Sequence, residues 1–168
     1  IANDGGLEYS TNGGANWIPI QNIPVSQFYS VRSSRFGKYK ILGAQDAGVH
    51  IDFNGNWQRP IGGDGLDVRI DPVDSTTMYG AIQTGLNMER VEYYPPSQTL
   101  GHVTIMNNAL GGGVDATWRQ KILIDAADRN ILFTNYQDIF KSTNQGQTWT
   151  NLTTGSLGNG TEAIAYLY

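Results

Sequence analysis

Five aspartates stand in or beside predicted turns of this sequence, where a carboxylate can act on something outside its own strand. A carboxylate in such a turn can cap the local backbone, bind Ca²⁺ through its oxygens, or contact a polar ligand. The five are Asp4 in NDGG, Asp46 in GAQDAG, Asp64 and Asp67 in GGDGLD, and Asp138 in YQD.

Other reactive side chains are scarce. The 168-residue chain has no cysteine, which excludes disulfides, thiolate metal sites and thiol nucleophiles. Neither of its two histidines, His50 and His102, has a partner at a metal-ligand spacing, so both are read as ordinary strand or loop residues. We expect no cofactor and no metal site, with Ca²⁺ at the turn acids as the one alternative.

The composition indicates an all-β globular fold that can present these acids. Hydrophobic residues make up 39% of the chain, 21 residues are glycine, and Asn, Asp, Ser and Thr recur every few residues, which favours short strands joined by tight turns. The net charge is -4, and there is no basic cluster and no apolar run of about 20 residues. A nucleic-acid partner and a membrane span are therefore not expected.

A strand-turn-strand pattern recurs along the chain. VRIDPVDSTTMYG (68–80) aligns without gaps on ILIDAADRNILFT (122–134) and more loosely on VRSSRFGKYKILG (31–43). Each has an apolar, β-rich half, a polar turn, and a second apolar run. A short turn and a third strand follow each copy, as VHID, LNMER and IFKS. The pattern predicts a repeated antiparallel unit.

An eight-residue turn also recurs. STNGGANW (10–17) returns as STNQGQTW (142–149), and HIDFNGNW (50–57) is a degenerate copy. Ser and Asn side chains can bond the backbone of their own turn, Gly accepts left-handed backbone, and Trp offers a flat face to a neighbouring sheet. We interpret these turns as structural fasteners. Their key residues are Ser10, Asn12, Gly14, Trp17, Asp52, Trp57, Ser142, Asn144, Gly146 and Trp149.

Four-stranded units of roughly 40 to 50 residues are typical of β-propeller blades. The octapeptides follow the pattern S-x-D-x-G-x-x-W, and with GAQDAG and GGDGLDVRIDPVD they resemble the BNR or Asp-box propellers of sialidases, sortilin-type receptors and xyloglucanase-type glycoside hydrolases. The resemblance is to secreted bacterial members and covers nearly the whole chain. Asn12 and Asn144 stand where that family usually has Asp.

One propeller segment over residues 1–168 is predicted, with under four blades. Residues 1–20 supply two outer strands of one blade, 26–60, 65–110 and 118–152 are fuller blades, and 161–168 is an inner strand. An open array leaves an exposed core and an unpaired sheet edge. We expect the ring to be closed by missing sequence or another chain, with a small imperfect four-bladed ring as the alternative.

Topology places the five acids away from the fasteners. In an up-and-down blade with strands A (inner) to D (outer), the A-B and C-D turns share one end, while the B-C turns and the D-to-A links share the other. The octapeptides are C-D turns, whereas the acids occupy or adjoin the second end. The resemblance marks that end as the ligand-binding face, with Asp4, Asp67 and Asp138 as binding residues. Good turn formation alone is the simpler explanation of these acids.

Two functions remain open for that face. The first is non-catalytic binding of a glycan or protein by a secreted or cell-surface propeller. The second, implied by the xyloglucanase-like relatives, is inverting glycoside hydrolysis by Asp46 and Asp64, which requires carboxyls roughly 6.5 to 9.5 Å apart. A sialidase is disfavoured because its usual Arg-Ile-Pro motif is absent.

Overall fold

The computed structural model describes residues 1–3, 6–21, 26–85, 87–107, 118, 120–136 and 138–154. These residues form four antiparallel sheets and one 3₁₀ turn, η1 (Gln83–Gly85). No helix among them is long and apolar enough to cross a membrane. The inner strand predicted at 161–168 lies outside the described residues.

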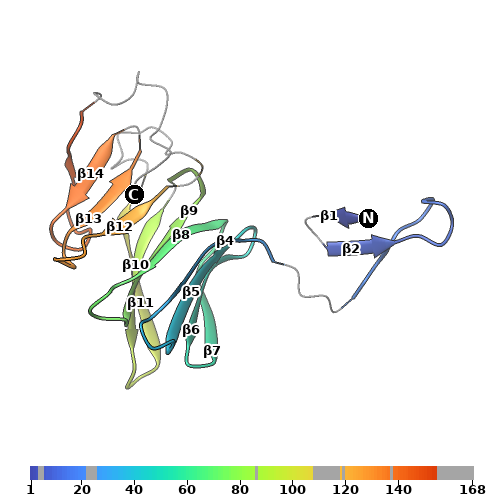
Figure 1. Ribbon diagram of the computed structural model, residues 1–168, viewed down its shortest axis with the longest axis horizontal. Coiled ribbons are helices and arrows are strands. Elements are labelled where there is room, and N and C mark those ends of the chain that lie inside the picture. Colours follow the sequence, from blue (N-terminus) through green and yellow to red (C-terminus); the bar gives the residue numbers. More distant parts are fainter. Residues whose placement is uncertain are drawn as a thin grey trace.

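Each sheet is a meander in which strands adjacent in sequence are also hydrogen-bonded neighbours (Figure 1). The first sheet holds β1 (Ala2–Asn3), β2 (Gly6–Tyr9) and β3 (Ile18–Pro19), one strand more than the two expected there. The second holds β4 (Phe28–Ser33), β5 (Tyr39–Ala44), β6 (Gly48–Phe53) and β7 (Asn56–Ile61). The third holds β8 (Gly65–Ile70), β9 (Thr77–Ile82), β10 (Met88–Tyr94) and β11 (Thr99–Met106). The fourth holds β12 (Ile122–Ile124), β13 (Leu132–Asn135), β14 (Ile139–Ser142) and β15 (Thr150–Asn151).

The three four-stranded sheets pack face to face through their first strands. Strand β8 lies against β4 on one side and β12 on the other, so the first strand of each sheet is the inner one. This is the arrangement of blades around a propeller axis, and it confirms the all-β propeller prediction.

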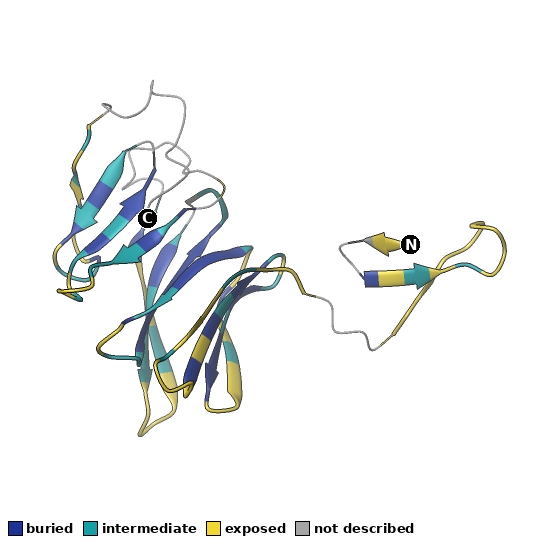
Figure 2. Ribbon diagram, in the orientation of Figure 1, coloured by how far each residue is buried: buried dark blue, intermediate teal, exposed yellow. Residues whose placement is uncertain are grey.

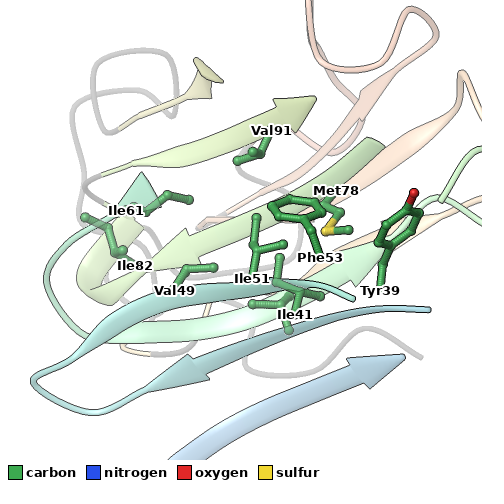
Figure 3. Close-up of a cluster of buried hydrophobic side chains, with 10 residues drawn as sticks. Tyr39, Ile41, Val49, Ile51, Phe53, Ile61, Met78, Ile82 and Val91 are labelled. Atoms are coloured by element: carbon green, nitrogen blue, oxygen red, sulfur yellow. The ribbon is translucent and has the colours of Figure 1, made fainter. Parts of the chain in front are cut away.

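Apolar residues that alternate along the strands fill the spaces between the blades. In β9, Met78 and Ile82 face the β4–β7 blade, whereas Tyr79 and Ala81 face the β12–β15 blade. Figure 3 shows the first cluster, in which Ile41, Val49 and Ile51 meet Met78 and Val91 from the next blade. Full burial of such a side chain contributes about 1.5 to 3 kcal/mol, so the inter-blade layers dominate the stability of this fold.

The β8–β9 and β12–β13 hairpins, which join the first two strands of their blades, repeat the same capping chemistry. The Asp71 carboxylate accepts the N-H groups of Val73 and Asp74, and the Asp125 carboxylate accepts those of Ala127 and Asp128. The aligned sequences around 71 and 125 therefore share one turn, built by an acid that caps its own backbone.

The β1–β3 sheet lies apart from the three packed blades (Figure 1). Figure 2 shows it mostly exposed, in contrast to the buried strands β5, β6 and β9 of the packed blades. Five of its large apolar side chains are between 41% and 48% exposed: Leu7, Tyr9, Trp17, Ile18 and Ile20.

Candidate functional site

The loops divide between the two ends of the blades, as the meander topology requires. One end carries the turn between β5 and β6, the link between β7 and β8, and the turn between β9 and β10. The other end carries the turns between the first and second strands and between the third and fourth. Asp46 and Asp64 lie at the first end, and the octapeptide 142–149, between β14 and β15, lies at the second. The octapeptide 10–17 joins β2 to β3 in the separate sheet.

Asp46 and Asp64 meet where a turn and a link cross. The Asp64 carboxylate accepts the backbone N-H of Asp46 at 2.5 Å. The backbone N-H of Asp64 donates to the Gln83 side chain of the following blade at 2.8 Å. Asp64 therefore ties the β5–β6 turn to the β9–β10 turn across a blade boundary.

Three glycines make this junction compact. A Cβ at Gly43 would lie 2.5 Å from the carbonyl oxygen of Gly65, and one at Gly65 would collide with the carbonyl oxygen of Gly48. Gly48 also has a φ of 83°, a left-handed conformation that glycine adopts without strain. The glycines let three backbone segments touch, which brings the two aspartates together.

The Asp46 side chain is exposed at this junction. Asp46 has a φ of 56°, and its carboxylate has no hydrogen-bond or ion-pair partner in the described part of the chain. A left-handed non-glycine residue costs free energy, roughly 1 to 3 kcal/mol, and such positions cluster at functional sites. Among the described acids predicted for this face, Asp46 alone keeps its carboxylate unengaged.

Asp138 and Asp67 have structural partners instead. The Asp138 carboxylate accepts hydrogen bonds from Asn151 at 2.8 Å and Thr153 at 2.9 Å, which secures the end of β15. Asp67 is 4% exposed; one of its oxygens accepts the N-H of Ile122 at 3.0 Å and the other pairs with Arg69 at 2.8 Å.

The expectation that Asp67 lies on an accessible face is therefore wrong. It points into the contact between inner strands β8 and β12, where it satisfies a backbone donor of the neighbouring blade. Burial holds the pKa of Arg69 below its ordinary value, and the charge and hydrogen bond of Asp67 oppose this only in part. Asp4 lies outside the described residues.

The two octapeptide turns form matching hydrogen-bond networks. The hydroxyl oxygen of Ser10 accepts the N-H of Gly14, and that of Ser142 accepts the N-H of Gly146, both at 2.8 Å. The side-chain oxygen of Asn12 accepts the N-H of Asn16 at 2.9 Å, and that of Asn144 accepts the N-H of Thr148 at 2.8 Å. Asn thus supplies the acceptor that Asp supplies in the resembling family.

The degenerate third copy does not form this turn. The connection between β6 and β7 is the two-residue loop Asn54–Gly55, with φ values of 57° and 95°. Asn-Gly with two positive φ angles favours a type I′ hairpin, whose twist matches the strands. Asp52 caps the N-H of Gly55 at 2.6 Å and pairs with Lys40 at 2.7 Å, so its role is structural but different from that of Asn12.

The histidines and acids of the described residues do not gather into a group of metal ligands. No group of three or more His, Asp or Glu side chains converges among the described residues. His50 contacts the carbonyl of Ala47 at 2.8 Å, and His102 contacts Glu89 at 2.8 Å. Both histidines are engaged in contacts within their own blades.

Comparison with known proteins adds evidence on the fold. No protein-family model matches the chain, and no curated protein matches its sequence. Among solved structures, a GH74 enzyme from Niastella koreensis superposes over 87% of this chain with a TM-score of 0.54. The chain is part of a β-propeller. It shares 17% sequence identity with that enzyme and spans about a quarter of its length (26%), so the likeness shows the fold and not the activity.

Proposed function

We propose that this chain is a non-catalytic binding segment of a larger Asp-box propeller in a secreted or cell-surface protein. The ligand, a glycan or a protein, contacts the end of the blades that carries Asp46. The observation that supports this is a difference among the acids. The carboxylates of Asp64, Asp67 and Asp138 accept hydrogen bonds from other residues of the chain, whereas the Asp46 carboxylate is exposed.

The hydrogen bonding of Asp64 favours binding over paired-acid hydrolysis. An inverting glycosidase needs one carboxyl that donates a proton to the leaving oxygen and a second that activates water. Asp64 instead accepts a backbone N-H from Asp46, its would-be partner, at 2.5 Å. One Asp64 oxygen thus supports the turn, whereas neither oxygen of Asp46 is engaged within the described residues.

The proposal includes a closed ring. Propellers commonly have four to eight blades, and the described chain supplies three full ones and a separate three-stranded sheet. Further blades from additional sequence or from another chain would cover the outer faces of the array.

A paired assay on the full-length protein tests the proposal. Binding to xyloglucan and related β-glucans is measured by calorimetry, and release of reducing ends is measured on the same polymers. We expect binding without hydrolysis, weakened about tenfold or more by Asp46→Asn, since one charge-assisted hydrogen bond contributes about 1.5 to 3 kcal/mol and about 1.4 kcal/mol corresponds to tenfold in affinity. Asn144→Ala, in the octapeptide turn at the opposite end of the blades, serves as the control and leaves binding unchanged.

Two results would contradict the proposal. Release of reducing ends that both Asp46→Asn and Asp64→Asn abolish would establish the hydrolase instead. An equal loss of binding in Asn144→Ala and Asp46→Asn would show that the Asp46 end is not the binding face.

A further inference from the structure

A groove of about 620 Å³ runs between two hairpin turns at the other end of the blades, away from Asp46. One wall is the β4–β5 turn and the other is the β8–β9 turn, both at the octapeptide end (Figure 1). Its volume lies within the range of ligand sites, about 300 to 1,000 Å³. The side chains that matter most are Ser34, Arg35, Phe36, Lys38, Val73 and Ser75.

The β4–β5 turn reverses the charge seen at the equivalent turns. The sequences DPVD and DAAD occupy this position in the next two blades, whereas this blade has Ser-Arg-Phe-Gly before Lys38. The Ser34 hydroxyl accepts the N-H of Tyr39 at 3.0 Å, so the turn is capped without a carboxylate. Ser34 and Gly37 therefore take the positions of the two acids, and a cation, Arg35 or Lys38, follows each of them.

Neither cation is neutralised by the chain. Arg35 and Lys38 are exposed and form no ion pair within the described residues. The guanidinium of Arg35 lies 5.5 Å from the centre of the Phe36 ring, and the ammonium of Lys38 lies 5.0 Å from that of Tyr39. These cation-π contacts orient both charges and leave their N-H groups available.

The opposite wall does not cancel this charge. Asp71 is 1% exposed, accepts two backbone N-H groups and forms an ion pair with Arg129 at 2.7 Å. Ser75 adds a hydroxyl and Val73 an exposed apolar surface. The groove is thus locally cationic on a chain whose net charge is -4.

A second hollow adjoins the groove at Lys38, and together the two favour an elongated ligand. A depression of about 320 Å³ shares Lys38 with the groove and is lined by the side chains of Asn54, Asn56 and Gln98 beside Tyr39. Amides and hydroxyls beside aromatic rings suit a chain rich in hydroxyl groups. The Phe36 ring is 88% exposed and offers a flat apolar face of the size of a sugar ring.

We propose that this track binds an acidic polysaccharide with uronic-acid units. Sugar carboxylates would pair with Arg35 and Lys38, a pyranose face would lie on Phe36, and sugar hydroxyls would bond Ser75 and the amides of the second hollow. Arg suits this role because its planar fork matches a carboxylate. The proposal is independent of the Asp46 face, because the two sites lie at opposite ends of the blades.

Calorimetric titration of the full-length protein with oligogalacturonates of increasing length tests this proposal. We expect affinity to rise with length, to weaken about tenfold or more in Arg35→Ala/Lys38→Ala, and to weaken several-fold in Phe36→Ala but not in Phe36→Tyr. The matched control, Arg59→Ala/Lys141→Ala, removes the same charge outside both hollows and should change affinity by less than about twofold. A thermal melt establishes that each variant is folded, which is expected because none of these side chains is buried.

Three outcomes would overturn the proposal. The first is no binding of oligogalacturonate by the unaltered protein. The second is an equal loss of affinity in the control double variant, which would show that the effect comes from the net charge of the protein and not from the groove. The third is binding of poly-glutamate as tight as that of the sugar with no effect of Phe36→Ala, which would assign the track to acidic peptides.

Discussion

The two octapeptide turns are the same local structure in two different surroundings. In both, a Ser hydroxyl accepts the Gly N-H at 2.8 Å and an Asn amide oxygen accepts a second N-H at 2.8 to 2.9 Å. Their tryptophans differ. Trp17 is 47% exposed, whereas Trp149 packs against the core cluster between the last two blades and donates its indole N-H to the carbonyl of Ile105 at 2.6 Å.

The difference shows which part of a fastener is local. Ser, Asn and Gly build the turn from atoms within eight residues, so it forms in either place. The tryptophan contact requires the last strand of the preceding blade, which Trp149 has in β11. A fastener therefore stabilises the array only where a preceding blade is packed beside it.

The largest expected effect is the loss of that packing. Trp149→Ala should lower the free energy of unfolding by about 3 kcal/mol, since it removes a large aromatic from between two blades together with its hydrogen bond. Trp17→Ala should cost less than about 1 kcal/mol because Trp17 has no such neighbour. Urea denaturation of the two variants measures both values. Equal losses would contradict the distinction between a packed and an unpacked fastener.

The glycines of the two turns should show a smaller difference. Gly146 has a φ of 86°, and a Cβ there would lie 2.7 Å from the Ile105 side chain. Gly14 has a φ of 90°, but its Cβ would meet only Trp17, at 3.6 Å. Both Gly→Ala changes incur backbone strain of about 1 to 2 kcal/mol.

Only Gly146→Ala adds a clash, worth about 1 to 3 kcal/mol more. Thermal or urea unfolding of the matched pair gives the difference. A Gly14→Ala variant as unstable as Gly146→Ala would mean that strain alone sets the cost and that the Ile105 contact adds nothing.

The serines test the hydrogen bond in two environments. Ser142 is buried, whereas Ser10 is partly buried and its hydrogen bond to Gly14 is exposed. Ser142→Ala leaves the Gly146 N-H without its partner where water has little access, at a cost of about 1 to 3 kcal/mol. Water replaces the lost acceptor in Ser10→Ala, so the cost should be about 0.5 kcal/mol. Hydrogen exchange at Gly14 and Gly146 follows each bond directly, and equal acceleration in both variants would contradict the dependence on burial.

The fold was predictable because its signals are local. Strand alternation, the capping acids Asp71 and Asp125, and the Ser-Asn-Gly turns act within about ten residues, a range that sequence patterns report directly. The prediction that residues 50–57 form a degenerate copy of the octapeptide turn was wrong because a different local signal is present there. Asn54–Gly55 is a stronger local signal than the Asp and Trp that flank it, and it closes a two-residue hairpin.

The candidate site was only partly predictable. Sequence order placed Asp46 and Asp64 at one end, and the structure brings them together through a bond between residues 18 positions apart. The role of Asp67 depends on the N-H of Ile122, 55 positions away on another blade, which no local pattern reports. The cationic groove was not predictable from the sequence. Arg35 and Lys38 lie in one hairpin turn, and only the structure shows that this turn and the β8–β9 turn form the two walls of one groove.

The smallest expected effect is a pH dependence that the Asp52 hairpin shows and the two Asn-based turns do not. The hydrogen bond from Lys40 holds the pKa of Asp52 below its ordinary value, against the opposing effect of burial and with help from the Gly55 N-H. The folded pKa thus lies below the unfolded one, about 3.9. The contribution of this carboxylate to stability is complete above that value and is lost as pH falls through the folded pKa.

The Asn12 and Asn144 amides do not titrate, so only the Asp52 hairpin should respond to acid. The amide shift of Gly55, followed by NMR from about pH 6 to pH 2, should move with a midpoint below about 3.9, while the shifts of Gly14 and Gly146 stay flat. Asp52→Asn should flatten the Gly55 curve as well, since it keeps an acceptor and removes the charge. A Gly55 midpoint at or above the ordinary value would show that burial outweighs the Lys40 bond and that the third turn lacks the electrostatic support that distinguishes it from the other two.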